Sequence, residues 1–460
     1  MECVIYASLI NLNLFITMKK IYFISFLGLL LSVNILAQKV TFEEYDLSNG
    51  LHVILHQDNS APVVTTQVLY NVGGKDLGGD NNPERTGFAH FFEHLLFEGT
   101  ENIERGKWSE IVDSNGGNNN AGTALDYTVY YEVFPSNNLE LGLWLESERM
   151  LHPVINQIGV DTQSEVIKEE KRTNYDNQPY RQFVFAISEN LFKVHPYKNK
   201  NIGEMEHLDA ATLDEFKAYF KKYYGPNNAV LVIAGDIDIS NTKNLVSKYF
   251  NDIPRGEKVV RNFPKEEPIT ETISAKFYDS NIKIPAIMAA YRIPGFIERD
   301  SYVLEMISTY LSDGKTSKLY KRIVDDKKMA LQVGAINIAQ KDYGAYVLYG
   351  LPLGEKSLES LVVEMDDEIK KIQTELISER DFQKIQNKLE NQFVNSNSSV
   401  ERIAGSLAEY YMLYGDTNLI NNEIDIYRSI TRKDIQTVAN KYLNPNQRLL
   451  LDYLPKEKEQ

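Results

Sequence analysis

A short pattern occurs twice in this chain, and it constrains the fold more than any other feature of the sequence. Residues 222–231, Lys-Tyr-Tyr-Gly-Pro-Asn-Asn-Ala-Val-Leu, resemble residues 441–450, Lys-Tyr-Leu-Asn-Pro-Asn-Gln-Arg-Leu-Leu, at a constant offset of 219 residues. Each copy follows a helical stretch and precedes an apolar strand. Chance similarity of a helix end is the alternative, but the equal register favours two copies of one α+β unit. A length of 460 residues also suits at least two domains.

The hydrophobic pattern predicts that each domain is a mostly antiparallel sheet packed with helices, an α+β fold. In the first half, strands are expected at residues 40–45, 51–55, 63–72, 119–134 and 230–234. Helices are expected at 87–97, with Thr86 as the N-cap, and at 139–150 and 162–175. A connector rich in proline and charge at 256–270 separates the predicted domains, which cover 38–255 and 271–460.

The first 37 residues have the pattern of an export signal. Met18-Lys19-Lys20 is a basic start, residues 21–36 form an apolar run, and Ala37-Gln38 fits a cleavage point. A membrane anchor is the alternative, but the run is short for a span. We expect an exported protein without a membrane span in its mature chain. It would be periplasmic, with an extracellular location as the alternative, and Met18 is an alternative translation start.

Charge and cysteine content narrow the function. The formal net charge is −15, so no basic excess is available for phosphates, and nucleic acid is not an expected partner. The single cysteine, Cys3, lies in the predicted leader. Any metal in the mature chain must therefore be bound by histidine, aspartate or glutamate.

The segment His90-Phe-Phe-Glu93-His94 predicts a metal site. Residues four apart lie on one face of a helix, so both imidazoles can reach one tetrahedral zinc ion. Glu93 can take the proton of a water that the metal activates, which makes it the expected catalytic base. A pair of structural histidines on an amphipathic helix is the alternative, and Glu93 between them disfavours it.

A catalytic zinc site needs a third protein ligand as well as an open position. Glu165, Glu169 and Glu170 lie in a charged helical stretch further along the chain. Spacing alone does not choose among them, and a solvated helix face is the alternative.

Small side chains at Asn120, Ala121, Gly122 and Thr123 predict an accessible strand edge. A peptide can pair with such an edge through main-chain hydrogen bonds. An ordinary edge strand without a ligand is the alternative.

The zinc motif and its flanks, Gly87 to Thr100, resemble the inverted motif of the pitrilysin and insulysin peptidases, the inverzincin M16 family. The two-domain length resembles the branch that contains mitochondrial processing peptidase. Residues 117–123, 224–229 and Gly235-Asp236 also match, and the resemblance covers about residues 41–455. It implies two homologous domains that face each other as half of a clam-shell, around a chamber for unfolded peptides.

The resemblance also implies individual roles. His90 and His94 would be zinc ligands and Glu93 the base. The third ligand of the family is the last acid of a Val-x-x-Glu-Glu stretch, 76 residues after the second histidine, which here is Glu170. Where the family often has a further glutamate, seven residues before this ligand, the chain has Gln163, so the shell around the ligands departs from the pattern. The edge at residues 120–121, Asn120 and Ala121, would bind substrate.

A second departure concerns the later domain. Family members that act alone or as like pairs carry an arginine and a tyrosine, seven residues apart, that contact the substrate. Val324 and Leu331 stand at these positions, and Arg322 and Tyr320 are near but out of register. The resemblance therefore implies a heterodimer in which a homologous chain supplies the pair, with a homodimer as the alternative.

Together these features predict a zinc-dependent endopeptidase with one Zn²⁺ per chain, which hydrolyses internal bonds of unfolded peptides as the catalytic subunit of a heterodimer. A non-catalytic peptide-binding or assembly subunit on the same fold is the main alternative. A zinc hydrolase that acts on non-peptide substrates is a third alternative, but no feature of the sequence supports it.

Overall fold

The computed structural model of the protein describes residues 39–456. Thr41–Gln460 forms one compact unit, and the predicted leader at 1–37 lies outside the described residues. Among the residues that are described, no helix has both the length and the hydropathy that a membrane span requires.

The first half of the chain contains a six-stranded sheet with the order β1-β2-β6-β3-β5-β4. Its strands are β1 (Glu43–Asp46), β2 (His52–Gln57), β3 (Val63–Tyr70), β4 (Asn118–Thr123), β5 (Thr128–Pro135) and β6 (Ala229–Gly235). Strands β2 and β6 are parallel, and all other neighbours are antiparallel. The helices and helical turns are α2 (Gly78–Asn81), α3 (Phe88–Leu95), α4 (Trp108–Ser114), η1 (Ser136–Asn138), α5 (Leu139–Leu151), α6 (Gln157–Glu170), η2 (Lys171–Asp176), α7 (Phe183–Leu191), η3 (Pro196–Lys198), α8 (Met205–Asp209), α9 (Leu213–Tyr223), η4 (Pro226–Asn228) and α10 (Ile239–Phe250).

The second half contains a five-stranded sheet with the order β7-β11-β8-β10-β9, again with one parallel pair, β7 and β11. Its strands are β7 (Ile273–Asp279), β8 (Ala286–Pro294), β9 (Ala330–Ala339), β10 (Tyr343–Pro352) and β11 (Leu449–Pro455). The helical elements are α11 (Arg299–Ser312), η5 (Tyr320–Asp326), α12 (Leu358–Thr374), α13 (Glu379–Ser396), α14 (Val400–Glu409), η6 (Tyr410–Tyr414), α15 (Leu419–Ser429) and α16 (Arg432–Tyr442).

The two sheets have the same topology once the extra edge strand β1 is set aside. In chain order, β2 to β6 correspond to β7 to β11, and the parallel pair joins the first and last strand of each set. The helix before the last strand begins in each half with a reciprocal capping box, at Thr212 and Glu215 in α9 and at Thr431 and Asp434 in α16. These boxes have the same offset as the sequence repeat, so the predicted fold of two homologous α+β domains is confirmed.

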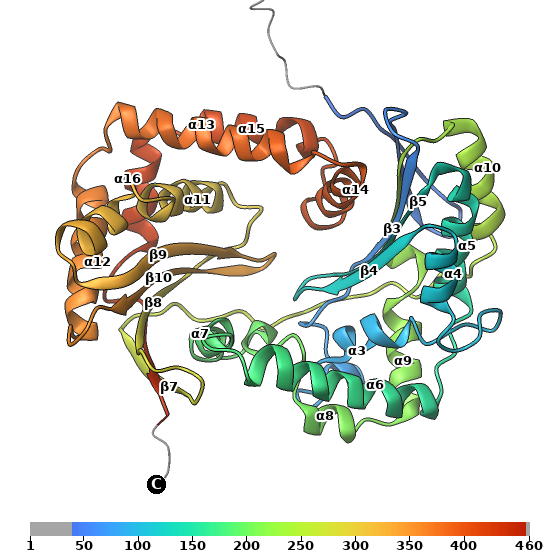
Figure 1. Ribbon diagram of the computed structural model, residues 1–460, viewed down its shortest axis with the longest axis horizontal. Helices are drawn as coiled ribbons and strands as arrows, with labels where there is room; N and C mark the ends of the chain where they lie inside the picture. Colours follow the sequence, from blue (N-terminus) through green and yellow to red (C-terminus); the bar gives the residue numbers. More distant parts are fainter. Residues whose placement is uncertain (1–38, 457–460) are drawn as a thin grey trace, which may run out of the picture. The chain divides into compact units, whose positions relative to one another are not determined.

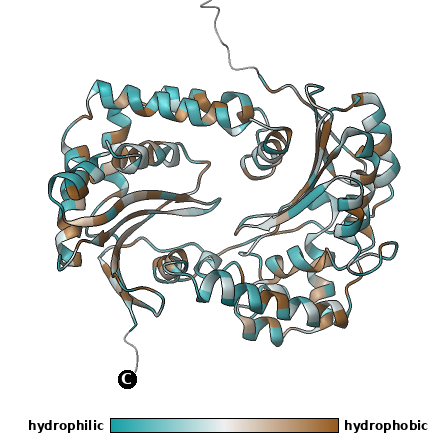
Figure 2. Ribbon diagram, viewed as in Figure 1, coloured by the Kyte–Doolittle hydropathy of each residue, from teal (hydrophilic) through white to brown (hydrophobic). Residues whose placement is uncertain are grey.

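Helices cover the sheets on both faces, because their strands alternate between two buried sides. In the first sheet, α5 packs on one face of β3, while α14 from the second half packs on β3 and β6 from the other side (Figure 1). In β8, residues Ile287, Ala289 and Tyr291 join one core with α11, α12 and α16, whereas Met288 and Ala290 join another core with α7. Figure 2 shows apolar residues along the strands and a largely hydrophilic α13.

The prediction that Thr86 is the N-cap of the motif helix is wrong. Gly87, with φ of 83°, occupies the N-cap of α3, and a Cβ on it would lie 2.8 Å from Gly203 Cα. Only glycine tolerates both this conformation and this backbone approach. The hydroxyl of Thr86 instead lies 2.8 Å from His207 Nδ1 and accepts a bond from the N–H of Glu204.

The single long strand that was expected at 119–134 is wrong, because β4 and β5 form a hairpin. The turn between them closes with a bond from the N–H of Ala124 to the carbonyl of Tyr127 at 2.8 Å. The carboxylate of Asp126, in this turn, is buried and binds Lys75 and Tyr197. Contacts from distant parts of the chain therefore hold a bend that the alternating pattern did not reveal.

Candidate metal centre

An aromatic cluster fixes the orientation of α3. Phe88 stacks against Phe216 of α9 with centroids 4.8 Å apart, Phe91 packs tilted against the same ring at 4.6 Å, and Phe92 stacks against Tyr219 at 5.5 Å. These rings are buried, and they occupy the apolar face of the helix. The histidines of the motif consequently lie on the opposite face, because residues 90 and 94 are one turn apart.

The second element of the centre is α6, which packs against α3. Asn156 caps its start by accepting a bond from the N–H of Gly159 at 2.9 Å. Val160 and Ile167 bury one face of the helix in the core of the first half. This packing brings Glu170, the last residue of α6, to the two histidines.

His90, His94 and Glu170 converge on one point. Glu170 Oε2 lies 3.4 Å from His90 Nε2 and 3.2 Å from His94 Nε2, and one ligand atom from each residue lies within 4.8 Å of the others. Tetrahedral coordination with bonds of roughly 2.05 Å would place neighbouring ligand atoms about 3.3 Å apart. The separations are therefore those of a zinc site with two nitrogen ligands and one oxygen ligand.

The polar atoms of this cluster also fit a cation. His90 Nδ1 is buried and has no hydrogen-bond partner among the residues that the structure describes, and the buried Oε2 of Glu170 faces only the two imidazoles. Hydrogen bonding to His90 and His94 holds the pKa of the Glu170 carboxyl well below its usual range, although partial burial opposes this. A carboxylate that stays ionised beside two imidazoles is a suitable donor set for zinc.

The neighbouring glutamates point elsewhere. Glu165 is exposed and pairs with Lys168, and Glu169 pairs with Arg172 on the solvent side of the helix. Of the three glutamates that spacing left open, only Glu170 reaches the histidines.

Glu93 lies on the same helix face as the two histidines and is partly buried. Its carboxylate has no hydrogen bond or ion pair within residues 39–456, so it is free to accept a proton. Burial raises the pKa of Tyr175, and the negative charges of Glu170 and then Glu93 raise it further. Both carboxylates therefore act on one small region beside the candidate metal centre.

Gln163 lies seven residues before Glu170 on α6, and its amide donates to Glu98. Glu98 also pairs with Arg105 at the surface. No bond from Gln163 to a histidine of the motif is present among the described residues. Its part in the shell around the ligands remains a prediction.

Asn120 and Ala121 lie in β4, the edge strand of the first sheet, which contacts α3. On the inner side they pair with Tyr131 and Tyr130 of β5. The N–H of Ala121 donates to the side chain of Asn120 at 2.9 Å. The outer edge has no partner strand among the described residues, so its backbone is available for an added strand.

A buried ionic cluster, which sequence reasoning missed, supports the end of α3. Arg149 is fully buried and donates to the carbonyl of Leu96, directly after the helix, at 3.1 Å. Its guanidinium also pairs with Glu132 at 3.0 Å and with Glu146 at 3.2 Å. The signal was available in the sequence, because Glu146 and Arg149 are charged residues inside the strongly apolar stretch 139–151.

The residues at the positions of the missing arginine and tyrosine cannot replace them. Val324 packs against the core of the second half, and Leu331 is 48% exposed in β9. Arg322 is held by three acids of α12 within 3.1 Å, which are Glu364, Asp367 and Glu368. A guanidinium with three carboxylate partners is not free to contact a substrate.

Comparison with known proteins agrees with this architecture. Residues 52–204 match the family model described as insulinase, peptidase family M16, and residues 210–389 match the one described as the peptidase M16 inactive domain. The chain belongs to the pitrilysin and insulinase type of M16 peptidases. All three predicted metal ligands lie in the first of the two matched ranges.

Individual relatives cover most of the chain. The chain is 26% identical to "Zinc protease PqqE" of Helicobacter pylori over 408 residues, 88% of this chain and 91% of that protein. It is 22% identical to a probable β subunit of mitochondrial-processing peptidase of Arabidopsis thaliana over 410 residues, 86% of this chain and 75% of that protein.

Two solved structures have the same fold. The crystal structure of a protease from Helicobacter pylori has a TM-score of 0.84 and 26% identity, and covers 90% of this chain and 100% of that chain. The periplasmic protease PqqL from Escherichia coli has a TM-score of 0.75 and 18% identity, and covers 90% of this chain but 47% of the longer PqqL chain.

Proposed function

We propose that the protein is a zinc-dependent endopeptidase that cleaves internal bonds of unfolded peptides and binds one Zn²⁺ per chain. The observation that carries this proposal is the convergence of His90, His94 and Glu170 at the separations of a tetrahedral site, with the buried Nδ1 of His90 left without a partner. The "zinc protease" names of its relatives support the same reading.

In this mechanism His90, His94 and Glu170 would hold the metal, which when bound would supply Lewis-acid activation of water and of the scissile carbonyl. Glu93 accepts the proton of the attacking water and later gives it to the leaving amine. Asn120 and Ala121 align the peptide by strand addition along the free edge of β4, where Asn120 must first release the N–H of Ala121. Gln163 lies on α6 with Glu170 and supports the residues around the metal ligands.

The catalytic partner is proposed to be a homologous chain. Val324 and Leu331 lack the chemistry to polarise a carbonyl, and Arg322 is engaged by acids of α12. A sister chain that carries the arginine and tyrosine would complete the site. The β-subunit name of the plant relative supports a heterodimer, and a homodimer is the alternative.

The domain limits and the location are further parts of the proposal. We assign 38–255 to the zinc-binding domain, 256–270 to a linker and 271–460 to the second domain. In support, residues between Phe250 and Ile273 contain no helix or strand in this described part of the chain. Export of the mature chain to the periplasm is proposed from the leader pattern, and the periplasmic PqqL has the same fold.

A non-catalytic peptide-binding or assembly subunit is the second candidate. Val324 and Leu331 favour it, because a subunit without the substrate-contacting pair could bind peptides without cleaving them. The free carboxylate of Glu93 beside the histidines favours the enzyme.

The deciding experiment measures bound zinc and peptide hydrolysis by the chain from Gln38, alone and with the sister chain. Its matched control is Glu93→Gln, which keeps the three ligands. We expect about one zinc per chain in both proteins, and cleavage only with intact Glu93. If the Glu93→Gln variant still cleaves peptides, or if the chain binds no zinc, the enzyme proposal is wrong. Full activity without the sister chain would sink the heterodimer.

A further inference from the structure

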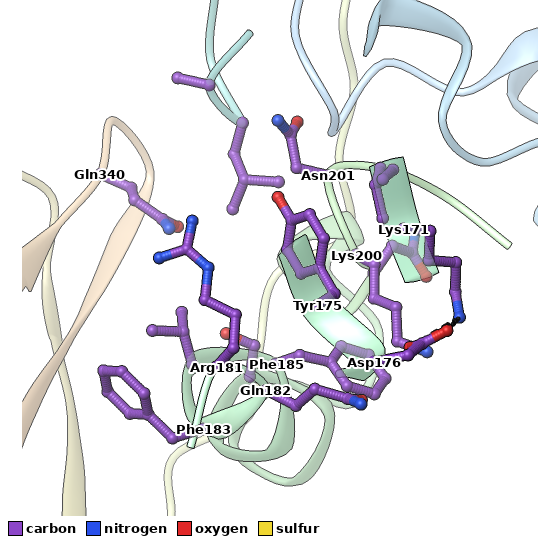
Figure 3. A pocket seen from close by; sticks show the side chains of 16 residues that line it. Lys171, Tyr175, Asp176, Arg181, Gln182, Phe183, Phe185, Lys200, Asn201 and Gln340 are labelled. Carbon is purple, nitrogen blue, oxygen red and sulfur yellow. Dashed lines mark hydrogen bonds and ion pairs between the residues drawn. The ribbon is translucent and has the colours of Figure 1, made fainter. Parts of the chain in front are cut away.

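A pocket of about 340 Å³ lies just beyond the carboxyl end of α6 (Figure 3). One part of its wall, Ala124 and Leu125, directly follows the free edge strand β4. Another part, Lys171 and Tyr175, comes one and five residues after Glu170 in the helical turn η2. The chain therefore places this pocket where the proposed substrate edge and the candidate metal centre meet.

The wall of the pocket is basic, although the protein as a whole has a net charge of −15. It contains Lys171, Arg181 and Lys200 but only one acid, Asp176. Lys171 pairs with Asp176 at 2.7 Å, and Lys200 pairs with Glu204 at 3.0 Å. Arg181 has no carboxylate within ion-pair distance among residues 39–456, so one positive charge of the pocket is not neutralised by the protein.

The side chain of Arg181 points into the pocket. Figure 3 shows it rising between Tyr175 and Gln340, and its guanidinium carbon lies 5.5 Å from the centroid of the Tyr175 ring. Charge and a side-chain hydrogen bond between Arg181 and Tyr175 orient the guanidinium, and its remaining N–H donors can bind a ligand. A planar guanidinium in this position is suited to bidentate binding of a carboxylate.

Two buried acceptors complete the wall. Asn201 Oδ1 and Gln340 Oε1 have no hydrogen-bond partner among the described residues, and both residues line the pocket. Asn201 donates its amide to the carbonyl of Thr123, the last residue of β4. A buried acceptor without a donor costs free energy.

We propose that this pocket is a specificity site that binds a carboxylate of the peptide substrate, with Arg181 as its partner. This inference rests on the proposed peptidase function. Tyr175 lies five positions after Glu170 in the helical segment, which corresponds to roughly 5–8 Å along the helix axis. An extended peptide covers this distance in about two residues. The preferred acid therefore lies two or three residues from the scissile bond.

The test uses short peptides that differ only in one Glu or Gln, moved through the positions on both sides of the cleaved bond. Binding is measured on the zinc-loaded Glu93→Gln protein, and kcat/KM on the wild type with its partner. A third set has no acidic side chain and either a free or an amidated carboxyl end. This set distinguishes a side-chain carboxylate from a terminal carboxylate.

At the preferred position, the Glu peptide is expected to bind about tenfold more tightly than its Gln twin. Arg181→Gln should abolish this ratio, and Arg172→Gln should preserve it. Arg172 is an exposed arginine in η2, paired with Glu169, and it does not line the pocket. Equal binding of the Glu and Gln peptides, or a preference that survives Arg181→Gln, overturns the proposal. Because the binding arm needs no cleavage, its outcome is separate from failure of the peptidase proposal.

Discussion

At the scale of single residues, two adjacent glutamates have opposite surroundings. The carboxylate of Glu170 faces two imidazoles through its buried Oε2. Glu169 extends into solvent and pairs with Arg172. This contrast provides a test of the metal centre with a matched control one residue away.

Replacing Glu170 by Gln is expected to weaken zinc binding by at least about 100-fold, because the anionic ligand is lost. Glu169→Gln, which removes the same charge, should leave the affinity nearly unchanged. A competition titration with a chelator measures both variants. Equal affinity in Glu170→Gln and wild type would contradict the proposed ligand set.

The buried pair of Glu132 and Glu146 shares one arginine, and this makes stability depend on pH. Burial, and then the charge of Glu146, raises the pKa of Glu132 well above its usual range. The folded state therefore keeps a proton that the unfolded chain loses near pH 4.3. Above that pH the unfolded state binds fewer protons, so the free energy of unfolding falls as pH rises, by about 1.4 kcal/mol per unit at most.

We expect Glu132→Gln to flatten this dependence until the pKa of Glu132 in the folded state is reached, because the variant has no proton to lose at this site. Urea unfolding between pH 5 and pH 9, roughly the window above the unfolded pKa, compares the two slopes. If both slopes are the same, Glu132 is already ionised in the folded protein.

At the scale of elements, α3 is held from three directions. Its apolar face packs on α9, the hydroxyl of Tyr130 in β5 donates to the carbonyl of Phe92 at 2.8 Å, and Arg149 of α5 donates to Leu96. The guanidinium of Arg149 also lies 4.1 Å from the ring centroid of Trp108. A helix with these anchors can present its histidines in one fixed geometry.

Arg149→Met should lower the free energy of unfolding by about 3–5 kcal/mol, because it leaves the buried acidic pair Glu132 and Glu146 without its cation. Arg105→Met is the surface control: Arg105 is half exposed and pairs with Glu98, and its loss should change stability little. Denaturant titrations of the three proteins give the comparison. A loss as small as that of the control would show that the carboxylates are neutral in the fold.

At the scale of the whole molecule, a buried ionic cluster joins the two halves of the chain. Lys75, in the loop after β3, lies 2.7 Å from Asp126 of the β4–β5 turn and 2.8 Å from Asp342 of the β9–β10 turn. His195 Nε2 approaches Asp342 at 3.4 Å. Bonding by His195 and the charge of Lys75 hold the pKa of Asp342 well below its usual range, against the effect of burial.

Lys75→Met should therefore cost about 3 kcal/mol of stability, since the buried Asp126 and the partly exposed Asp342 both lose their cation. Because the cluster spans both halves, the variant should also separate their unfolding, which differential scanning calorimetry would show as two transitions. Lys318→Met, which removes a partly exposed pair with Asp381 inside the second half, should leave one transition. Two transitions in that control would mean that the halves unfold separately even when the cluster is intact.

The local structure, and the chemistry that depends on it, could be predicted from the residue pattern. The repeat at 222–231 and 441–450 marks helix ends that precede strands β6 and β11, and both copies are in place. The helix of the zinc motif also forms as expected, because the spacing of His90 and His94 and the apolar residues around them are properties of neighbours within two turns. These features require no knowledge of the distant chain.

Which side chains from distant parts of the chain come into contact depends on the tertiary structure. Spacing left three glutamates open, family resemblance selected Glu170, and the packing of α6 on α3 brings that residue to the histidines. The bend between β4 and β5, the Arg149 cluster and the free charge of Arg181 were not predicted. Each depends on contacts between residues that are far apart in the chain. The local sequence pattern does not indicate which charged side chains form ion pairs with distant residues and which remain unpaired.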